Sequence, residues 1–228
     1  MASPLGTLAA GTVTPVRRRT LGALFAVSVL ALPGAGAYAL RDPVLRAAGA
    51  ALVQEDALFA ADVVVIATGA GPAGVLEAAD LVHAGVAPRV AVFADPPDPA
   101  DREFLRRGVP YEDVATRSRR QLRALGVASV EVIPRAVAGS EDEGRVLPEW
   151  CEERGWRSVV VVSSSDHTRR LRRVLRRSMD GGQTRVAVRA ARHSRFDPET
   201  WWHTRDGVRT EAIELQKLLL DLARHPLP

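Results

Sequence analysis

The chain has 228 residues, enough for one medium-sized domain, and its 46% apolar and 25% charged residues are ordinary for a globular protein. This composition excludes an intrinsically disordered chain, a collagen-like chain and a polytopic membrane protein. The formal net charge of +4 lies at the N-terminus, because residues 1–41 hold four arginines and no acidic residue. The 27 basic and 27 acidic residues of 42–228 balance. A neutral domain argues against nucleic acid as a partner, since domains that bind it carry their excess charge on the folded part.

The cysteine and histidine pattern limits the chemistry further. Cys151 is the only cysteine, which excludes an internal disulfide, a dithiol redox pair and a multi-cysteine zinc site. It falls among charged residues of a predicted helix with no cue for activation, so we interpret it as structural. The histidines outside the motifs below show no metal-ligand spacing, and we expect no metal site. The sequence leaves the cofactor open.

The N-terminal segment has the features of an export or anchoring signal. Three arginines at 17–19 precede the uncharged stretch 20–40. The twelve-residue apolar core Leu21–Leu32, the helix breaker after it and the Ala37-x-Ala39 pattern fit a cleaved signal peptide. The whole stretch is also long enough to span a bilayer as a signal anchor, the alternative that we favour. Either way, the arginines place the N-terminus in the cytoplasm and the rest outside.

We therefore expect 1–41 to be a leader with a membrane segment, 42–60 a linker, and 61–228 the folded domain. In that domain apolar runs alternate with amphipathic segments. Predicted strands cover 62–66, 89–93, 129–133, 158–162 and 184–188. Predicted helices cover 75–84, 101–107, 113–125, 141–154 (interrupted at Pro148 or starting late), 166–177 and 211–223. The alternation predicts βαβ units and a three-layer α/β/α fold with a mostly parallel sheet of about five strands.

Three segments follow predicted strands, where ligands bind in such sheets. The first has a G-x-G-x-x-G spacing, Gly69, Gly71 and Gly74. Glycines allow the backbone to approach a phosphate, and the next helix start favours an anion. Pro72 removes one amide donor from this loop, and no acid lies in clear register for a dinucleotide ribose. We predict a tight turn or a general anion-binding loop there.

The second segment, Ser163–Arg170, follows the fourth strand. Ser164, Ser165 or Asp166 can cap the next helix. His167 and Arg170 are three residues apart and so share one face of that helix near its start. Together with free backbone amides they form a candidate phosphate or carboxylate site, with His167 as hydrogen-bond or proton donor. The alternative is a capping or core histidine.

The third segment is Ser140-Glu141-Asp142-Glu143, after the third strand. Acidic residues at a helix start are favoured by the helix dipole without any function. The functional alternative makes Glu141 or Glu143 a base or hydrogen-bond acceptor, and Ser140 a ligand contact.

In this order the segments resemble the YdcF/SanA/ElyC family of bacterial proteins, over about 61–223. The most specific cue is Ser163–Arg170, which is similar to the family's strand-Ser-x-x-His-x-x-Arg motif. The other cues are the glycine turn after Asp62–Ile66, Gly85-Val-Ala-Pro88, Gly108-Val-Pro110, Ser140–Glu143, Trp201-Trp202 and Glu214-x-x-Lys217. The chain departs from the family at Gly74, where an arginine is usual, and at Phe93-Ala-Asp95, where Ser-Gly-Gly is usual.

The resemblance implies an envelope protein, since its membrane-bound branch is linked to peptidoglycan synthesis and the lipid carrier. We expect an anionic or lipid-linked metabolite as ligand, bound by Gly69, Gly71, Ser140, Glu141, Ser164, Asp166 and Arg170. His167 and Glu143 are the candidate catalytic pair of a hydrolase or transferase. The alternative is a non-catalytic module that binds a protein or a nucleotide-like ligand such as S-adenosylmethionine, the ligand associated with the soluble branch.

Overall fold

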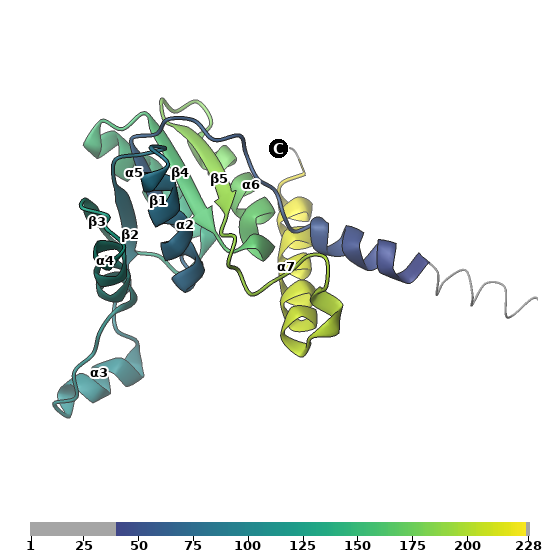
Figure 1. Cartoon of the computed structure of the whole chain (residues 1–228), viewed down its shortest axis with the longest axis horizontal. Helices are drawn as coiled ribbons and strands as arrows, with labels where there is room; N and C mark the ends of the chain where they lie inside the picture. The colour runs from purple at the N-terminus through teal and green to yellow at the C-terminus, as the bar shows by residue number, and fades with distance from the viewer. Residues whose placement is uncertain (1–39, 227–228) are drawn as a thin grey trace, which may run out of the picture. The chain divides into compact units, whose positions relative to one another are not determined.

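The computed structural model describes residues 40–226 (Figure 1). The chain divides into two compact units, residues 1–44 and 45–228. In the first unit only residues 40–44 are described, and they are helical. Of the expected membrane segment 20–40, all but the last residue lies outside the described residues. Among residues 40–226, no helix combines the length and the apolar character needed to cross a bilayer.

The second unit is built on a five-stranded, all-parallel sheet in the order β3-β2-β1-β4-β5, which confirms the expected α/β class. The neighbouring inner strands β1 and β4 are built on unbroken runs of β-branched residues, as is typical of strands covered on both faces. The strands are β1 (Val63–Ile66), β2 (Val90–Ala94), β3 (Val130–Ala136), β4 (Ser158–Ser163) and β5 (Arg185–Ala190).

Helices cover both faces of the sheet (Figure 1). Helices α2 (Gly71–His83) and α4 (Val114–Ala124) bury Ala78 and Leu122 against one face. Helices α5 (Ser140–Arg154) and α6 (Thr168–Met179) bury Trp150 and Leu171 against the other. The remaining elements are α3 (Pro99–Arg106), the 3-10 turns η1 (Ser165–His167) and η2 (Trp201–His203), and α7 (Arg205–Arg224).

Several helix boundaries differ from the sequence prediction, most clearly the starts of two helices, and a third helix is not interrupted where a break was expected. Helix α2 begins at Gly71, four residues early, because Pro72 occupies its first turn, where a missing amide hydrogen costs nothing. Helix α7 begins six residues early, where the Thr204 hydroxyl accepts a bond from the amide of Gly207. Helix α5 continues through Pro148. The buried Leu147 and Trp150 on either side tie this helix to the sheet, and that burial outweighs the cost of the proline.

Much of segment 45–60 packs on the domain. Leu52 is buried with Phe196 and Leu218 in a small core of its own. Beyond it the chain runs beside the open edge of β5, where Asp56 donates its amide to the Val188 carbonyl at 3.0 Å and accepts from the Val188 amide at 3.1 Å. These bonds satisfy backbone groups that an edge strand otherwise leaves open to another chain.

The topology places one switch point, between β1 and β4. From β1 the chain moves outward to β2 and β3, and from β4 it moves outward to β5 on the other side. The loops that leave β1 and β4 therefore diverge, and a crevice opens beyond the carboxyl ends of these two strands.

Candidate functional site

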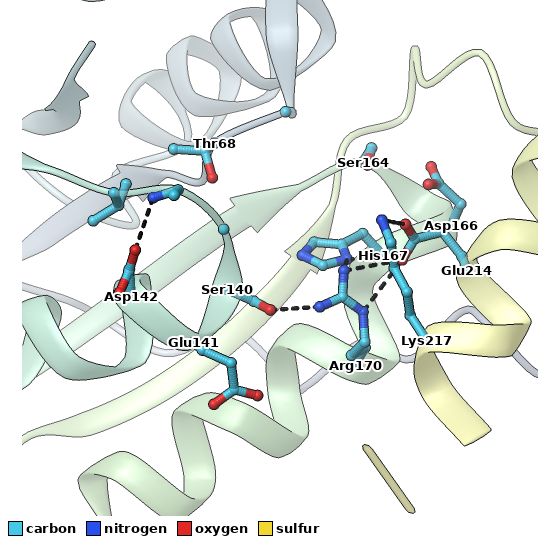
Figure 2. A pocket seen from close by; sticks show the side chains of 14 residues that line it. Thr68, Ser140, Glu141, Asp142, Ser164, Asp166, His167, Arg170, Glu214 and Lys217 are labelled. Carbon is cyan, nitrogen blue, oxygen red and sulfur yellow. Dashed lines mark hydrogen bonds and ion pairs between the residues drawn. The ribbon is translucent and has the colours of Figure 1, made fainter. Parts of the chain in front are cut away.

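A cavity of about 740 Å³ opens at the carboxyl edge of the sheet, beyond β1 and β4 (Figure 2). Its walls come from the β1–α2 loop, the start of α5, the start of α6 and the middle of α7. The lining residues are Thr68, Gly69, residues 137–142, Ser164, Asp166, His167, Arg170, Glu214 and Lys217. All three segments that the sequence singled out thus contribute to one cavity: the glycine turn through Gly69, Ser140–Glu143 through its first three residues, and Ser163–Arg170 through Ser164, Asp166, His167 and Arg170.

Arg170 is the centre of the charged cluster in this cavity. Its Nη1 donates to the Ser140 hydroxyl at 2.5 Å, and its Nη2 and Nε donate to Oε2 of Glu214 at 3.1 and 3.3 Å. Figure 2 shows the guanidinium held between these two partners. Its side chain is largely buried. Lys217, on the solvent side, donates to the other oxygen of Glu214 at 2.7 Å. Two cations therefore face one carboxylate, which leaves a surplus positive charge within this cluster of three side chains.

Glu214 is the anion that fixes this cluster. Burial raises the pKa of its carboxyl, but hydrogen bonds from His167 and Lys217, with the charge interactions of His167 and Arg170, outweigh burial and lower the pKa to about 2. Glu214 is therefore ionised at every physiological pH. Its position on α7 orients side chains that come from α6.

His167 has one edge in the cluster and the other turned to the cavity. Its Nδ1 lies 3.2 Å from Oε2 of Glu214 and 2.9 Å from Nη2 of Arg170. Nδ1 either donates to the carboxylate or accepts from the guanidinium, because one atom cannot do both at once. Among the described residues Nε2 has no hydrogen-bond partner, so it is the atom available to a ligand. A histidine ordered by a carboxylate is a common arrangement for proton transfer.

Helix α5 adds backbone donors to the same wall. Its first intrahelical bond runs from the Glu143 amide to the Gly139 carbonyl at 3.0 Å. The amides of Ser140, Glu141 and Asp142 precede that bond and have no acceptor within the helix. No side chain caps the helix at Gly139. The free amides and the helix dipole thus add to the attraction of Arg170 for an anion.

The acidic residues of this helix start have separate positions. Glu141 points to solvent with 71% of its side chain exposed and pairs with Arg177 at 3.4 Å. Asp142 accepts from the Ala138 amide and from Arg145, which offsets its charge. Glu143 is 1% exposed and lies behind the cavity wall.

Glu143 links α5 to the loop after β1. Its Oε1 accepts from the amide of Thr68 at 2.5 Å and from the Thr68 hydroxyl at 2.6 Å, while its Oε2 has no partner. Burial raises the pKa of this carboxyl, and the bonds from Thr68 and the charges of His167 and Arg170 only partly oppose that effect. Glu143 is thus a buried acid one residue layer from the cavity.

The glycine loop contributes shape. Gly69 and Gly71 have φ values of +84° and +56°, which residues with side chains rarely adopt. Gly69 lines the main cavity, whereas Gly71 lines a neighbouring one of about 490 Å³ that also reaches Ser164 and Asp166. Asp166 lies between the two cavities without a hydrogen-bond or ion-pair partner among the described residues.

Sequence reasoning did not select Thr68, Glu214 and Lys217 as site residues. Glu214 and Lys217 are 44 and 47 residues beyond Arg170, and only the Glu-x-x-Lys pattern at helical spacing marked them. Thr68 stood out only as the first residue of the glycine turn. Within residues 40–226, no group of three histidine, cysteine or acidic side chains is arranged to hold a metal ion. Cys151 is fully buried, and burial raises the pKa of its thiol to about 12, as suits a structural role.

Comparison with known proteins adds no relative. No family model matches the chain, and neither the curated proteins nor the solved structures contain a match. The resemblance to the YdcF/SanA/ElyC family therefore stays a prediction from the motifs.

Proposed function

We propose that the protein is an envelope protein whose domain lies outside the cytoplasm and binds a phosphorylated or otherwise anionic envelope metabolite in the cavity around Arg170. The observation that carries the proposal is the position of Arg170. Its guanidinium is fixed by Ser140 and Glu214 and lines an open cavity beside the unbonded amides of α5. A cation that is already ordered loses little entropy when it binds an anion.

We assign the anion to the α5 side of the cavity from the charges there. Arg170 and Lys217 outnumber Glu214 there, and Arg177 and Arg145 offset Glu141 and Asp142. On the opposite side, the unpaired Asp166 would repel an anion and suits a hydroxyl or amine donor. The expected ligand therefore carries a phosphate at one end and hydrogen-bond donors at the other, as a sugar phosphate or a lipid-carrier phosphate does.

Proton transfer at this site would fall to His167, with Glu214 orienting the ring. Such a pair is compatible with a hydrolase or transferase acting on a phosphate ester. The sequence suggested Glu143 as the catalytic partner of His167. In the structure Glu143 lies behind the cavity wall, and His167 contacts Glu214 instead. Glu143 holds Thr68 and reaches the cavity through that hydroxyl.

The alternative is a binding module without catalysis, and one observation favours it. The cavity wall has three hydroxyl groups: that of Thr68 donates to Glu143, that of Ser140 accepts from Arg170, and that of Ser164 has no hydrogen-bond partner among the described residues, so none of them is bonded to His167. None is activated by His167, as a nucleophile of a Ser–His pair would be.

A ligand screen by thermal shift on the purified protein tests the proposal. Candidate ligands are polyprenyl phosphates, sugar phosphates, nucleotides and S-adenosylmethionine. We expect a phosphate compound to raise the melting temperature of the wild type, and His167→Ala to reduce the shift. A ligand whose shift is the same in both proteins would place the site elsewhere. Phosphate release from the same ligand, lost in His167→Ala, would separate an enzyme from a binding module.

A further inference from the structure

Helix α7 is amphipathic in the opposite sense to an ordinary surface helix. Its buried face carries three carboxylates, Glu211, Glu214 and Asp221, and one buried leucine, Leu218, beside the partly buried Leu215. Large apolar residues point outward, with Val208, Ile213, Leu219 and Leu220 exposed at 45%, 40%, 56% and 48%. A surface helix normally buries its apolar stripe and exposes its charges.

Two of the three inward carboxylates, Glu214 and Asp221, have a clear cause. Helix α7 packs on α6, whose sides are rich in arginine. Asp221 accepts from Arg173 at 2.6 Å and pairs with Arg177 at 2.8 Å, and Glu214 pairs with Arg170. These ion pairs account for the buried Glu214 and Asp221, whereas both oxygens of Glu211 are buried without a hydrogen-bond partner among the described residues. The ion pairs do not explain why the outer face is apolar, so that face requires a partner of its own.

The outer face combines apolar area with unpaired positive charge. At 100° per residue, Leu219 and Leu220 share one side of the helix with Arg205 and Arg209. Both arginines are exposed and have no ion pair among the described residues. The nearest acid of the helix, Asp206, stands at the edge of this side. Leucines with unpaired arginines and no central acid are the pattern of a helix that lies in the interface of an anionic membrane.

We propose that the outer face of α7, defined by Arg205, Arg209, Ile213, Leu219 and Leu220, docks on the surface of an anionic lipid bilayer. A second copy of the chain fits this face less well. Pairing two α7 faces would set arginines against leucines, with no acid to meet them. The apolar stretch 20–40 precedes the domain by a few residues, so a bilayer is the partner within reach.

Docking of α7 would also bring the cavity close to the membrane. Glu214 and Lys217 of the same helix line it from the other side. With α7 on the bilayer, the cavity lies within one helix width of the lipid headgroups, about 10 Å. A ligand carried on a lipid could then enter without leaving the membrane. This consequence rests on the proposed function, whereas the docking itself does not.

A fluorescent label on α7 tests the docking in the full-length chain. The only native cysteine is fully buried, so a cysteine introduced by Leu219→Cys is labelled selectively with an environment-sensitive dye. The labelled chain is reconstituted in phosphatidylcholine vesicles with and without phosphatidylglycerol. Ala124→Cys, exposed at the end of α4, is the matched control. Unchanged tryptophan fluorescence shows that each variant is folded.

We expect a blue shift at position 219, and quenching by lipids that carry a quencher in the acyl chain, in phosphatidylglycerol vesicles. Position 124 stays unchanged. Arg205→Gln with Arg209→Gln weakens the docking about fivefold for each charge removed. An unshifted label at 219 in anionic vesicles would overturn the proposal. A shift that occurs without lipid and grows with protein concentration would also overturn it, because that result identifies a second copy of the chain as the partner. An equal shift in both kinds of vesicle that is unchanged by Arg205→Gln with Arg209→Gln would overturn it as well.

Discussion

Replacing Glu214 by glutamine removes the charge that holds the cavity cluster together while keeping the shape of the side chain. In the wild type this carboxylate lies between His167, Arg170 and Lys217. The substitution leaves Arg170, largely buried, without its counter-ion. We expect Glu214→Gln to destabilise the protein at neutral pH and to loosen the guanidinium from its binding position.

The magnitude follows from the pKa of the carboxyl. The cluster lowers that pKa from 4.5 to about 2. One pKa unit corresponds to about 1.4 kcal/mol, so the ionised form stabilises the fold by at most about 3.5 kcal/mol. Because the folded pKa is the lower one, this stability is complete above about pH 4.5 and is lost as the pH falls toward 2. The wild type and the variant should therefore converge in acid.

Urea unfolding followed by tryptophan fluorescence at pH 7, 4 and 3 measures this directly. Glu152→Gln, an exposed acid of α5, is the control and should leave the free energy of unfolding within about 0.5 kcal/mol of the wild type. A Glu214→Gln protein as stable as the wild type at pH 7 would show that the carboxylate does not stabilise the fold. A deficit that stays constant down to pH 3 would show that the loss comes from packing and not from the charge.

Three further predictions concern packing and the buried acid. Gly144→Ala should lower the free energy of unfolding in urea by about 1 to 3 kcal/mol, because the added Cβ would lie 2.6 Å from both Ser178 Oγ and Val174 Cγ1. An unchanged free energy of unfolding would mean that α5 and α6 are less tightly packed than described. Glu143→Gln should gain stability relative to the wild type as the pH rises from 4 to 8, because the raised pKa of Glu143 means that the fold favours the neutral acid. The gain should be about 1.4 kcal/mol for each unit by which folding raises the pKa. Parallel pH profiles of the two proteins would contradict a raised pKa. Cys151 should resist alkylation at pH 8 until the protein is denatured, and rapid labelling of the native protein would show that its site opens.

The sequence was sufficient to predict the class of fold and most strand positions, because short continuous β-branched runs such as Val159–Val162 are typical of buried strands. Helix starts were harder. The start of α7 depends on the Thr204 hydroxyl, and the continuity of α5 through Pro148 depends on what Leu147 and Trp150 pack against. Both are decided by local or tertiary contacts that periodicity does not contain.

The site was predictable where its residues follow strands. His167 and Arg170 came from helical spacing after β4, and Ser140 from its place after β3. The partner of His167 was not predictable from local sequence, because Glu214 reaches it from the far end of the chain. Glu143 appeared equivalent to Glu141 in the sequence. The structure separates them by burial, since one binds Thr68 behind the wall and the other faces solvent.

Arg170 is the residue on which anion binding at this site depends, and a calorimetric titration with inorganic phosphate measures its contribution. Arg170→Gln is compared with Arg176→Gln, an exposed arginine of the same helix. A hydrogen bond to a charged group contributes about 1.5 to 3 kcal/mol, so Arg170→Gln should weaken phosphate binding about tenfold or more while Arg176→Gln binds like the wild type. Equal affinity in all three proteins would contradict the central claim.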